Sequence, residues 1–225
     1  MRRNFLFLFL LLITPLFGCA ITYSANPITA RVVDAETKEP IEKVIVVAHW
    51  QLKGGMEGGN EVGQVMVLET ETDKNGQFYF PGWGPKLRSL SGTLKDESPA
   101  ILLFKNGYRY RGLSNEINKK TLYGDLDVPL KSDWDGKTIE VEKFKGTVEE
   151  YVRHVSSFSG NLRFVEDNCQ WKIVPRMILE LQKQLDVFKA AGIVTGFYSV
   201  DYLPMNKEDE AKCGSPKEFF KEYQK

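Results

Sequence analysis

The sequence predicts an α+β protein in which an N-terminal antiparallel β-sandwich is followed by a small helical C-terminal region. In the first half, short apolar runs rich in valine and isoleucine alternate with turn residues, which is typical of β-sandwiches. After residue 144 the apolar side chains recur at spacings of three and four, which indicates amphipathic helices. We therefore divide the chain into a signal peptide at 1–18, a sandwich at 19–131 and a mostly helical region at 132–225.

The first residues have the order found in export signals. Arg2 and Arg3 precede an apolar run at 5–13, and Pro15 and several small residues follow that run. As a helix, the run would cover about 14 Å of a hydrocarbon layer about 30 Å thick. This length favours a cleaved signal peptide over a membrane-spanning helix.

A cysteine follows the signal peptide directly. Residues 16–19, with the sequence LFGC, resemble the lipobox of bacterial lipoproteins, in which a peptidase cleaves before a lipid-carrying cysteine. The resemblance implies that lipid on Cys19 attaches the protein to a membrane. Because Ala20 rather than Asp follows the cysteine, it further implies a Gram-negative outer membrane, with the body facing the periplasm or the cell surface. The alternative is ordinary signal cleavage after Ala20, since Gly18 and Ala20 form a small-x-small pair.

Several strands are expected in the first half of the chain. The segments 28–35 and 41–50 are separated by a polar turn, and the nearly continuous apolar run in 41–50 predicts a central strand. The segments 64–73 and 77–80 flank Asn75-Gly76, which predicts a hairpin because this dipeptide tolerates the positive φ angles of a tight turn.

The same stretch resembles the carboxypeptidase regulatory-like family. The resemblance rests on Val33-Asp34, on Pro40 and on the segment 72–80, TDKNGQFYF, and it departs from the family at a glycine-rich insertion at 53–63. It implies a transthyretin-like or immunoglobulin-like β-sandwich that serves as an accessory module. It does not imply peptidase activity, because neither His49 nor His154 begins the His-x-x-Glu motif of a zinc carboxypeptidase.

The remaining elements complete the sandwich and begin the helical region. We expect a strand pair at 100–112 around Asn106-Gly107, a last strand at 121–131 and an alternating segment at 139–144. An amphipathic helix is expected at 146–158 with Thr147 as its N-cap.

Two further helices complete this region. One is expected to begin near Lys172, with Pro175 in its first turn, and to stop at Gly192. A short helix is expected at 215–224, so that the back half forms a three-helix appendage.

The cysteines support the expected location. With Cys19 assigned to lipid, Cys169 and Cys213 remain, and an exported protein meets an oxidising compartment in which such a pair can form a disulfide. The alternative is that the two thiols pack as small apolar groups.

Exposed aromatic residues are the candidate ligand-binding residues. Trp83, Tyr108 and Tyr110, together with Trp50, could form a stacking platform for a sugar or a peptide, and the alternative is packing in the core. Trp83 lies in the segment FPGWG, where glycine and proline favour an exposed loop.

No pattern in the sequence predicts a metal site or a cofactor. Glu150 and His154 lie four apart on the expected helix, which favours a surface ion pair with protonated histidine over metal binding. The segment 131–142 is similar to a calcium-binding loop, but Lys131 occupies the first ligand position, so a turn is expected. Serines near His154 lack the Gly-x-Ser-x-Gly elbow of a hydrolase.

Charge excludes one class of partner. Lys+Arg and Asp+Glu both number 30, so no basic excess is available for nucleic acid. We expect a non-catalytic cell-envelope lipoprotein that acts as a binding or assembly module for an envelope protein, glycan or peptide. The first alternative is a carbohydrate- or peptide-binding accessory protein with a pocket near Trp83, and the second is a cryptic hydrolase.

Overall fold

The computed structural model describes residues 22–54, 60–87, 92–116, 128–166, 169–203 and 207–223. The expected lipid site Cys19 and most of the expected strand at 121–131 lie outside these residues. The strands are β1 Thr22–Ala25, β2 Ile28–Asp34, β3 Ile45–Gly54, β4 Asn60–Glu71, β5 Gln77–Phe80, β6 Trp83–Leu87, β7 Thr93–Leu94, β8 Ala100–Phe104, β9 Arg111–Leu113 and β10 Thr138–Val141. The helices are α1 Val148–Ser159, α2 Pro175–Ala190, α3 Lys207–Cys213 and α4 Pro216–Lys221, with 3-10 segments η1 Gly160–Glu166, η2 Gln170–Ile173 and η3 Val200–Tyr202.

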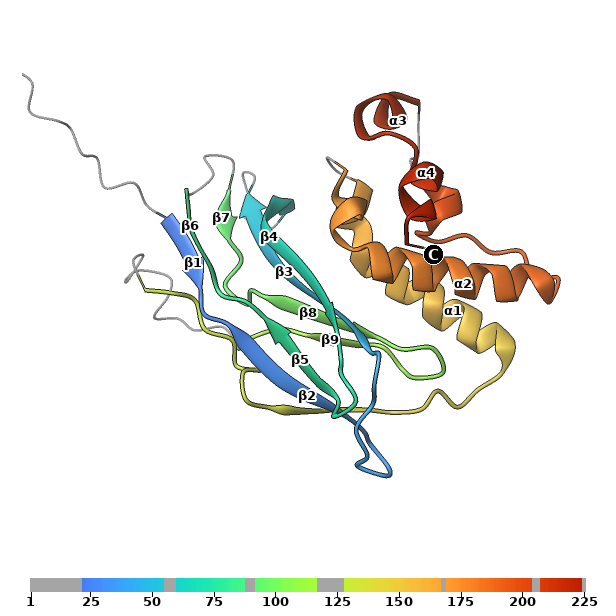
Figure 1. Ribbon diagram of the computed structural model, residues 1–225, viewed down its shortest axis with the longest axis horizontal. Coiled ribbons are helices and arrows are strands. Elements are labelled where there is room, and N and C mark those ends of the chain that lie inside the picture. Colours follow the sequence, from blue (N-terminus) through green and yellow to red (C-terminus); the bar gives the residue numbers. More distant parts are fainter. Residues whose placement is uncertain are drawn as a thin grey trace, which may run out of the picture.

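The strands form three sheets, followed in the chain by the helices (Figure 1). One sheet has the order β10-β2-β5, a second has the order β4-β3-β8-β9 with β7 also paired to β3, and β1 pairs with β6. Every strand pair among these elements is antiparallel except β10 with β2. The predicted α+β class is confirmed. The strand β10 lies beyond residue 131, where we expected the sandwich to end.

The central strand β3 is buried on both faces because two cores meet on it. Val46, Ala48 and Trp50 pack between the two larger sheets, in a cluster that includes residues of β2, β5, β8 and β10. Ile45 and Val47 point to the other face and pack against the helices. This double burial explains the nearly continuous apolar run of the sequence.

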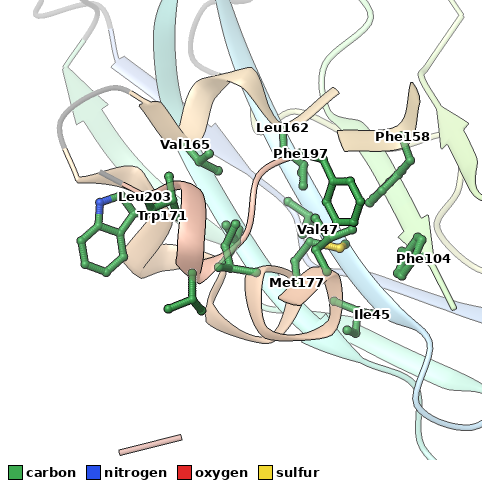
Figure 2. Packing of buried hydrophobic residues seen from close by; sticks show 14 of the residues in the cluster. Ile45, Val47, Phe104, Phe158, Leu162, Val165, Trp171, Met177, Phe197 and Leu203 are labelled. Carbon is green, nitrogen blue, oxygen red and sulfur yellow. The ribbon is translucent and has the colours of Figure 1, made fainter. Parts of the chain in front are cut away.

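The helices cover the outer face of the β4-β3-β8-β9 sheet, so the expectation of an appendage is wrong. Figure 2 shows Val47 and Phe104 of the sheet close to Phe158 and Met177 of the helices. The amphipathic stripes of α1 and α2 bury their apolar residues against this sheet, because neither face is stable alone in water.

The ends of α1 and α2 agree closely with the sequence. Thr147 caps α1, and its side chain forms a capping box with Glu150. Pro175 is the first residue of α2 rather than part of a first turn that begins near Lys172. Gly192, with φ of 76°, ends the helical segment.

The predicted hairpin around Asn75-Gly76 is wrong. Strand β4 pairs with β3 and β5 pairs with β2, so the turn connects two sheets instead of two neighbouring strands. Only Gly76 of the dipeptide has a positive φ, whereas the tight hairpin turn needs both residues there. The buried Thr72 redirects the chain, because its hydroxyl donates to the Ile41 carbonyl at 2.7 Å and accepts the Val44 N–H at 2.8 Å.

The second predicted strand pair is correct. Strands β8 and β9 pair with Leu102 opposite Gly112, and the connection between them contains Asn106-Gly107. The expected strand at 121–131 is represented among the described residues by a single bridge between Leu130 and Ala25.

A disulfide joins Cys169 and Cys213, the two cysteines that the sequence analysis pairs. It connects the start of η2 to the end of α3, a short helix that the sequence analysis did not expect. Among the described residues, no helix combines the length and apolar character needed to span a bilayer.

Candidate functional site

The three candidate ligand-binding aromatics lie at two separate places. Trp83 begins β6 opposite Ala25, just before the start of β2. Tyr108 and Tyr110 lie in the β8–β9 connection, and the Tyr108 hydroxyl donates to Asp34 at the far end of β2 at 3.2 Å. A single stacking platform of all three residues is therefore not formed.

Trp83 is half-buried and packs edge-on against Trp50, with ring centroids 5.3 Å apart. The indole N–H groups of both residues are buried and have no hydrogen-bond partner within the described part of the chain. Buried donors are normally paired, and an indole N–H can only donate. Both N–H groups are covered by protein, so at this end of the sandwich only the half-buried ring of Trp83 is partly open to a ligand.

Tyr110, in the β8–β9 connection, packs against the aromatic side chains His154 and Phe158 of α1. Its backbone N–H donates to Nε2 of His154 at 3.0 Å, and the two rings lie 4.7 Å apart. Burial, and then the nearby charge of Arg109, lower the pKa of His154. The lowered pKa favours the neutral imidazole, whose Nε2 accepts the Tyr110 N–H.

The expected ion pair of Glu150 with protonated His154 is wrong. The Glu150 carboxylate turns back to accept the backbone N–H of Thr147 at 2.8 Å and completes the helix cap. The lowered pKa of His154 also opposes protonation. A spacing of four on a helix brings two side chains within reach, but the cap competes successfully for the carboxylate.

Tyr108 contributes to the closure of a turn at Asp34. The carboxylate of Asp34 accepts the backbone N–H groups of Thr37 and Glu36 at 3.0 and 2.9 Å, and Lys143 lies 3.7 Å away. These N–H groups are the main cause that lowers the pKa of Asp34 to about 2. In Tyr108, burial and then Asp34 raise the pKa of the hydroxyl. The Val-Asp pattern of the family resemblance thus has a structural role here.

His49 is a packing residue on the helical side of β3. Its ring is 1% exposed and lies 4.4 Å from the ring of Phe164. Burial lowers the pKa of His49 to about 4, so the side chain is neutral near pH 7, although Glu61 lies 3.7 Å from its Nε2 atom.

The serines near α1 do not form a nucleophile–base pair with His154. Nε2 of His154 accepts a backbone N–H, while the Ser157 hydroxyl lies 3.3 Å from that of Tyr110. Ser159 accepts the backbone N–H of Tyr198 at 2.9 Å. A hydrolase needs a histidine nitrogen free to take the proton of the nucleophile, and this arrangement does not supply one.

Acidic side chains of the calcium-like segment accept backbone N–H groups from other segments of the chain. Asp135 accepts the backbone N–H of Thr29, and Asp133 accepts that of Glu116, both at 2.8 Å. Across the described ranges, no three histidine, cysteine, aspartate or glutamate side chains are grouped as metal ligands.

Glu69 is an important residue that sequence reasoning missed. Its side chain, 2% exposed, accepts the backbone N–H groups of Met177 and Arg176 at 2.8 and 3.0 Å, so a residue of β4 caps the start of α2. Burial is the main cause that raises the pKa of Glu69 to about 7. The only signal in the sequence is that Val174, before Pro175, has no side-chain acceptor to cap the helix.

Comparisons with known proteins give distant structural likenesses. No protein-family model matches the sequence, and no curated protein matches it. A 3-chlorocatechol 1,2-dioxygenase from Rhodococcus opacus 1CP is similar with a TM-score of 0.33 and 13% identity, over 55% of this chain and 61% of that one. The dioxygenase domain of a carbohydrate-binding fusion from Streptomyces sp. SirexAA-E gives a TM-score of 0.29 and 12% identity, over 57% of this chain and 84% of that one.

The major pilin subunit of Bacillus cereus is also similar, with a TM-score of 0.24 and 16% identity, over 53% of this chain and 30% of that one. The chain thus spans less than two thirds of the chlorocatechol dioxygenase and of the pilin subunit. Likeness at these TM-scores carries no argument about activity. The sheets themselves establish a β-rich fold with sandwich-like packing.

Proposed function

We propose that this protein is an exported lipoprotein of the cell envelope, anchored through lipid on Cys19, whose folded body acts as a binding or assembly module without catalysis. The leader and the lipobox-like segment 16–19 support export and lipidation. The observation that carries the proposal is the disulfide between Cys169 and Cys213, because such bonds persist in oxidising compartments outside the cytosol.

The state of the two histidines supports a role without catalysis. His154 accepts a backbone N–H, and His49 is buried and neutral. A general base needs a nitrogen that can reach substrate, and both side chains instead contribute to packing. The carboxypeptidase regulatory-like resemblance of the sandwich agrees with an accessory module.

Mass spectrometry of the protein purified from bacterial envelopes tests the anchor. We expect a mature chain that begins at Cys19 with a diacylglyceryl group, held in the membrane fraction. The variant Cys19→Ser should lose the lipid and leave that fraction, while the control Cys213→Ser should keep the lipid. An unmodified amino terminus at Ile21 would contradict lipidation, and a retained Met1 would contradict export altogether.

The second candidate is a sugar- or peptide-binding accessory protein with its site near Trp83. The half-buried ring of Trp83, held edge-on against Trp50, favours it. A ligand that binds only the folded form raises the melting temperature, so a thermal-shift screen of envelope glycans and peptides tests this candidate. The shift should disappear in Trp83→Phe, which keeps the ring packing, and persist in Tyr110→Phe at the other end of the sandwich.

A further inference from the structure

We infer that the β1–β6 end of the sandwich lies against the bilayer, with Leu87 in contact with lipid. This inference rests on the proposed lipidation of Cys19. Only Ala20 and Ile21 separate Cys19 from Thr22, the first residue of β1. A chain spans at most about 3.6 Å per residue, so the anchor lies within about 11 Å of Thr22. The tether is too short to let this end of the body move far from the membrane.

The residues at this end suit a membrane surface. Thr22 is paired with Leu87 at the last position of β6, and the Leu87 side chain is 74% exposed. Partner Cα atoms in antiparallel strands lie about 5 Å apart, so Leu87 is held beside the anchor by the strand pairing. Lys86, the residue before Leu87 in β6, is also exposed, and its Nζ atom donates to the Val65 carbonyl of β4 at 3.3 Å. A lysine at this end suits anionic headgroups.

Neighbouring strands bring a second apolar side chain to the same end. The Tyr23 hydroxyl accepts the Leu94 N–H at 3.2 Å, which holds β7 beside β1. Strand β7 pairs with the end of β3, and the start of β4 carries Val62, which is 40% exposed. In Figure 1, the start of β1, the end of β6 and strand β7 lie together at one end of the molecule.

This orientation directs a different surface away from the membrane. From Thr22, the chain runs through β1 and β2 to the turn at 35–40, a distance of up to about 40 Å at the rise of a strand. The β8–β9 connection, with Tyr108 beside Asp34, lies at that far end. A partner in the periplasm or outside the cell would therefore meet the turn at 35–40 and the β8–β9 connection.

A depth measurement on the lipidated protein tests the inference. In the mature protein, lipid occupies Cys19 and the disulfide occupies the other cysteines, so Leu87→Cys introduces a unique thiol. The matched control is Val194→Cys, because Val194 is 100% exposed and follows the far end of α2. Both variants carry an environment-sensitive fluorophore in vesicles of phosphatidylethanolamine and phosphatidylglycerol that contain spin-labelled lipid as quencher.

We expect the label at position 87 to be quenched several-fold more strongly than the label at 194. A flexible insertion of Gly and Ser between Ala20 and Ile21 should abolish that difference while lipidation remains. Equal quenching at the two positions, in protein whose mass shows lipid on Cys19, would overturn the inference alone. A mass without lipid would overturn the proposed function, and the inference with it, so the two failures are distinguishable.

Discussion

Asp34 and Glu69 both bind backbone N–H groups with a carboxylate, yet their pKa values move in opposite directions. At Asp34 the donors of the turn outweigh burial and lower the pKa to about 2. At Glu69 burial outweighs the donors of α2 and raises the pKa to about 7. The sequence shows both residues but not this difference, because the surroundings of Glu69 are formed by α2, far away along the chain.

The pKa of Asp34 gives a prediction for acid stability. Its folded value lies below the ordinary value of 3.8, so its stabilising effect is present above pH 3.8 and is lost as pH falls through about 2. We expect Asp34→Asn to lower the melting temperature at pH 7. In urea denaturation, it should also reduce the fall in unfolding free energy below pH 3.8, which we call the acid limb. Glu42→Gln, an exposed carboxylate nearby, should leave the limb unchanged. An acid limb in Asp34→Asn equal to that of the wild type would contradict the prediction.

Glu69 predicts the opposite trend at higher pH. Its folded pKa lies above the ordinary value of 4.5, so the protein should lose stability as pH rises from about 4.5 to 7. We expect Glu69→Gln to remove most of this loss, which amounts to about 3 kcal/mol at most. Glu71→Gln is the control, because Glu71 also lies near Arg176 but is 45% exposed. Urea denaturation at several pH values tests this. If the unfolding free energy falls with pH equally steeply in the two variants, the prediction is contradicted.

At the scale of elements, the sequence predicted strands and helices more reliably than their partners. The apolar spacing and Thr147 correctly placed α1, because helix contacts are local. Asn75-Gly76 predicted a hairpin, but the buried Thr72 sends β4 and β5 to different sheets through contacts with Ile41 and Val44. Those contacts join residues about thirty positions apart, which no local turn pattern can reveal.

The disulfide should stabilise the helical layer through the loop that it closes. Cys169 and Cys213 lie 44 residues apart, and closing a loop of that length stabilises by about 4 kcal/mol in the chain-entropy model. We expect reductant to lower the unfolding free energy of the wild type by about this amount, which is measured as a lower urea midpoint. The double variant Cys169→Ser with Cys213→Ser should already have the lower midpoint and should not respond to reductant. An unchanged wild-type midpoint would show that the bond adds no stability.

At the scale of the whole molecule, sandwich and helices share β3 and therefore form one folding unit. In the sequence, the change from strand to helix spacing resembles a domain boundary. That local pattern does not reveal that Ile45 and Val47 need the helices as cover. The candidate site was predicted less well still, since Trp83 and Tyr108 lie at opposite ends of β2.

Two matched variants test this unity. Val46→Ala weakens the core between the sheets, and Val47→Ala weakens the core under the helices; both side chains are fully buried. Each should cost about 2 kcal/mol and shift the same single transition in calorimetry. Two separate transitions, each shifted by only one variant, would contradict a single folding unit.

The double burial of β3 also changes how its alignment within the sheet is chosen. In most sheets, a slip by one residue turns apolar groups toward water, and this penalty fixes the pairing. In β3, a slip by one residue would move apolar side chains from one buried face to the other, so the penalty for exposing apolar groups to water would be small. Side-chain volume must therefore fix the strand register. The broad indole of Trp50 fits the core between the sheets, and the smaller imidazole of His49 fits the face toward the helices. Misaligned pairings during folding are thus rejected by shape.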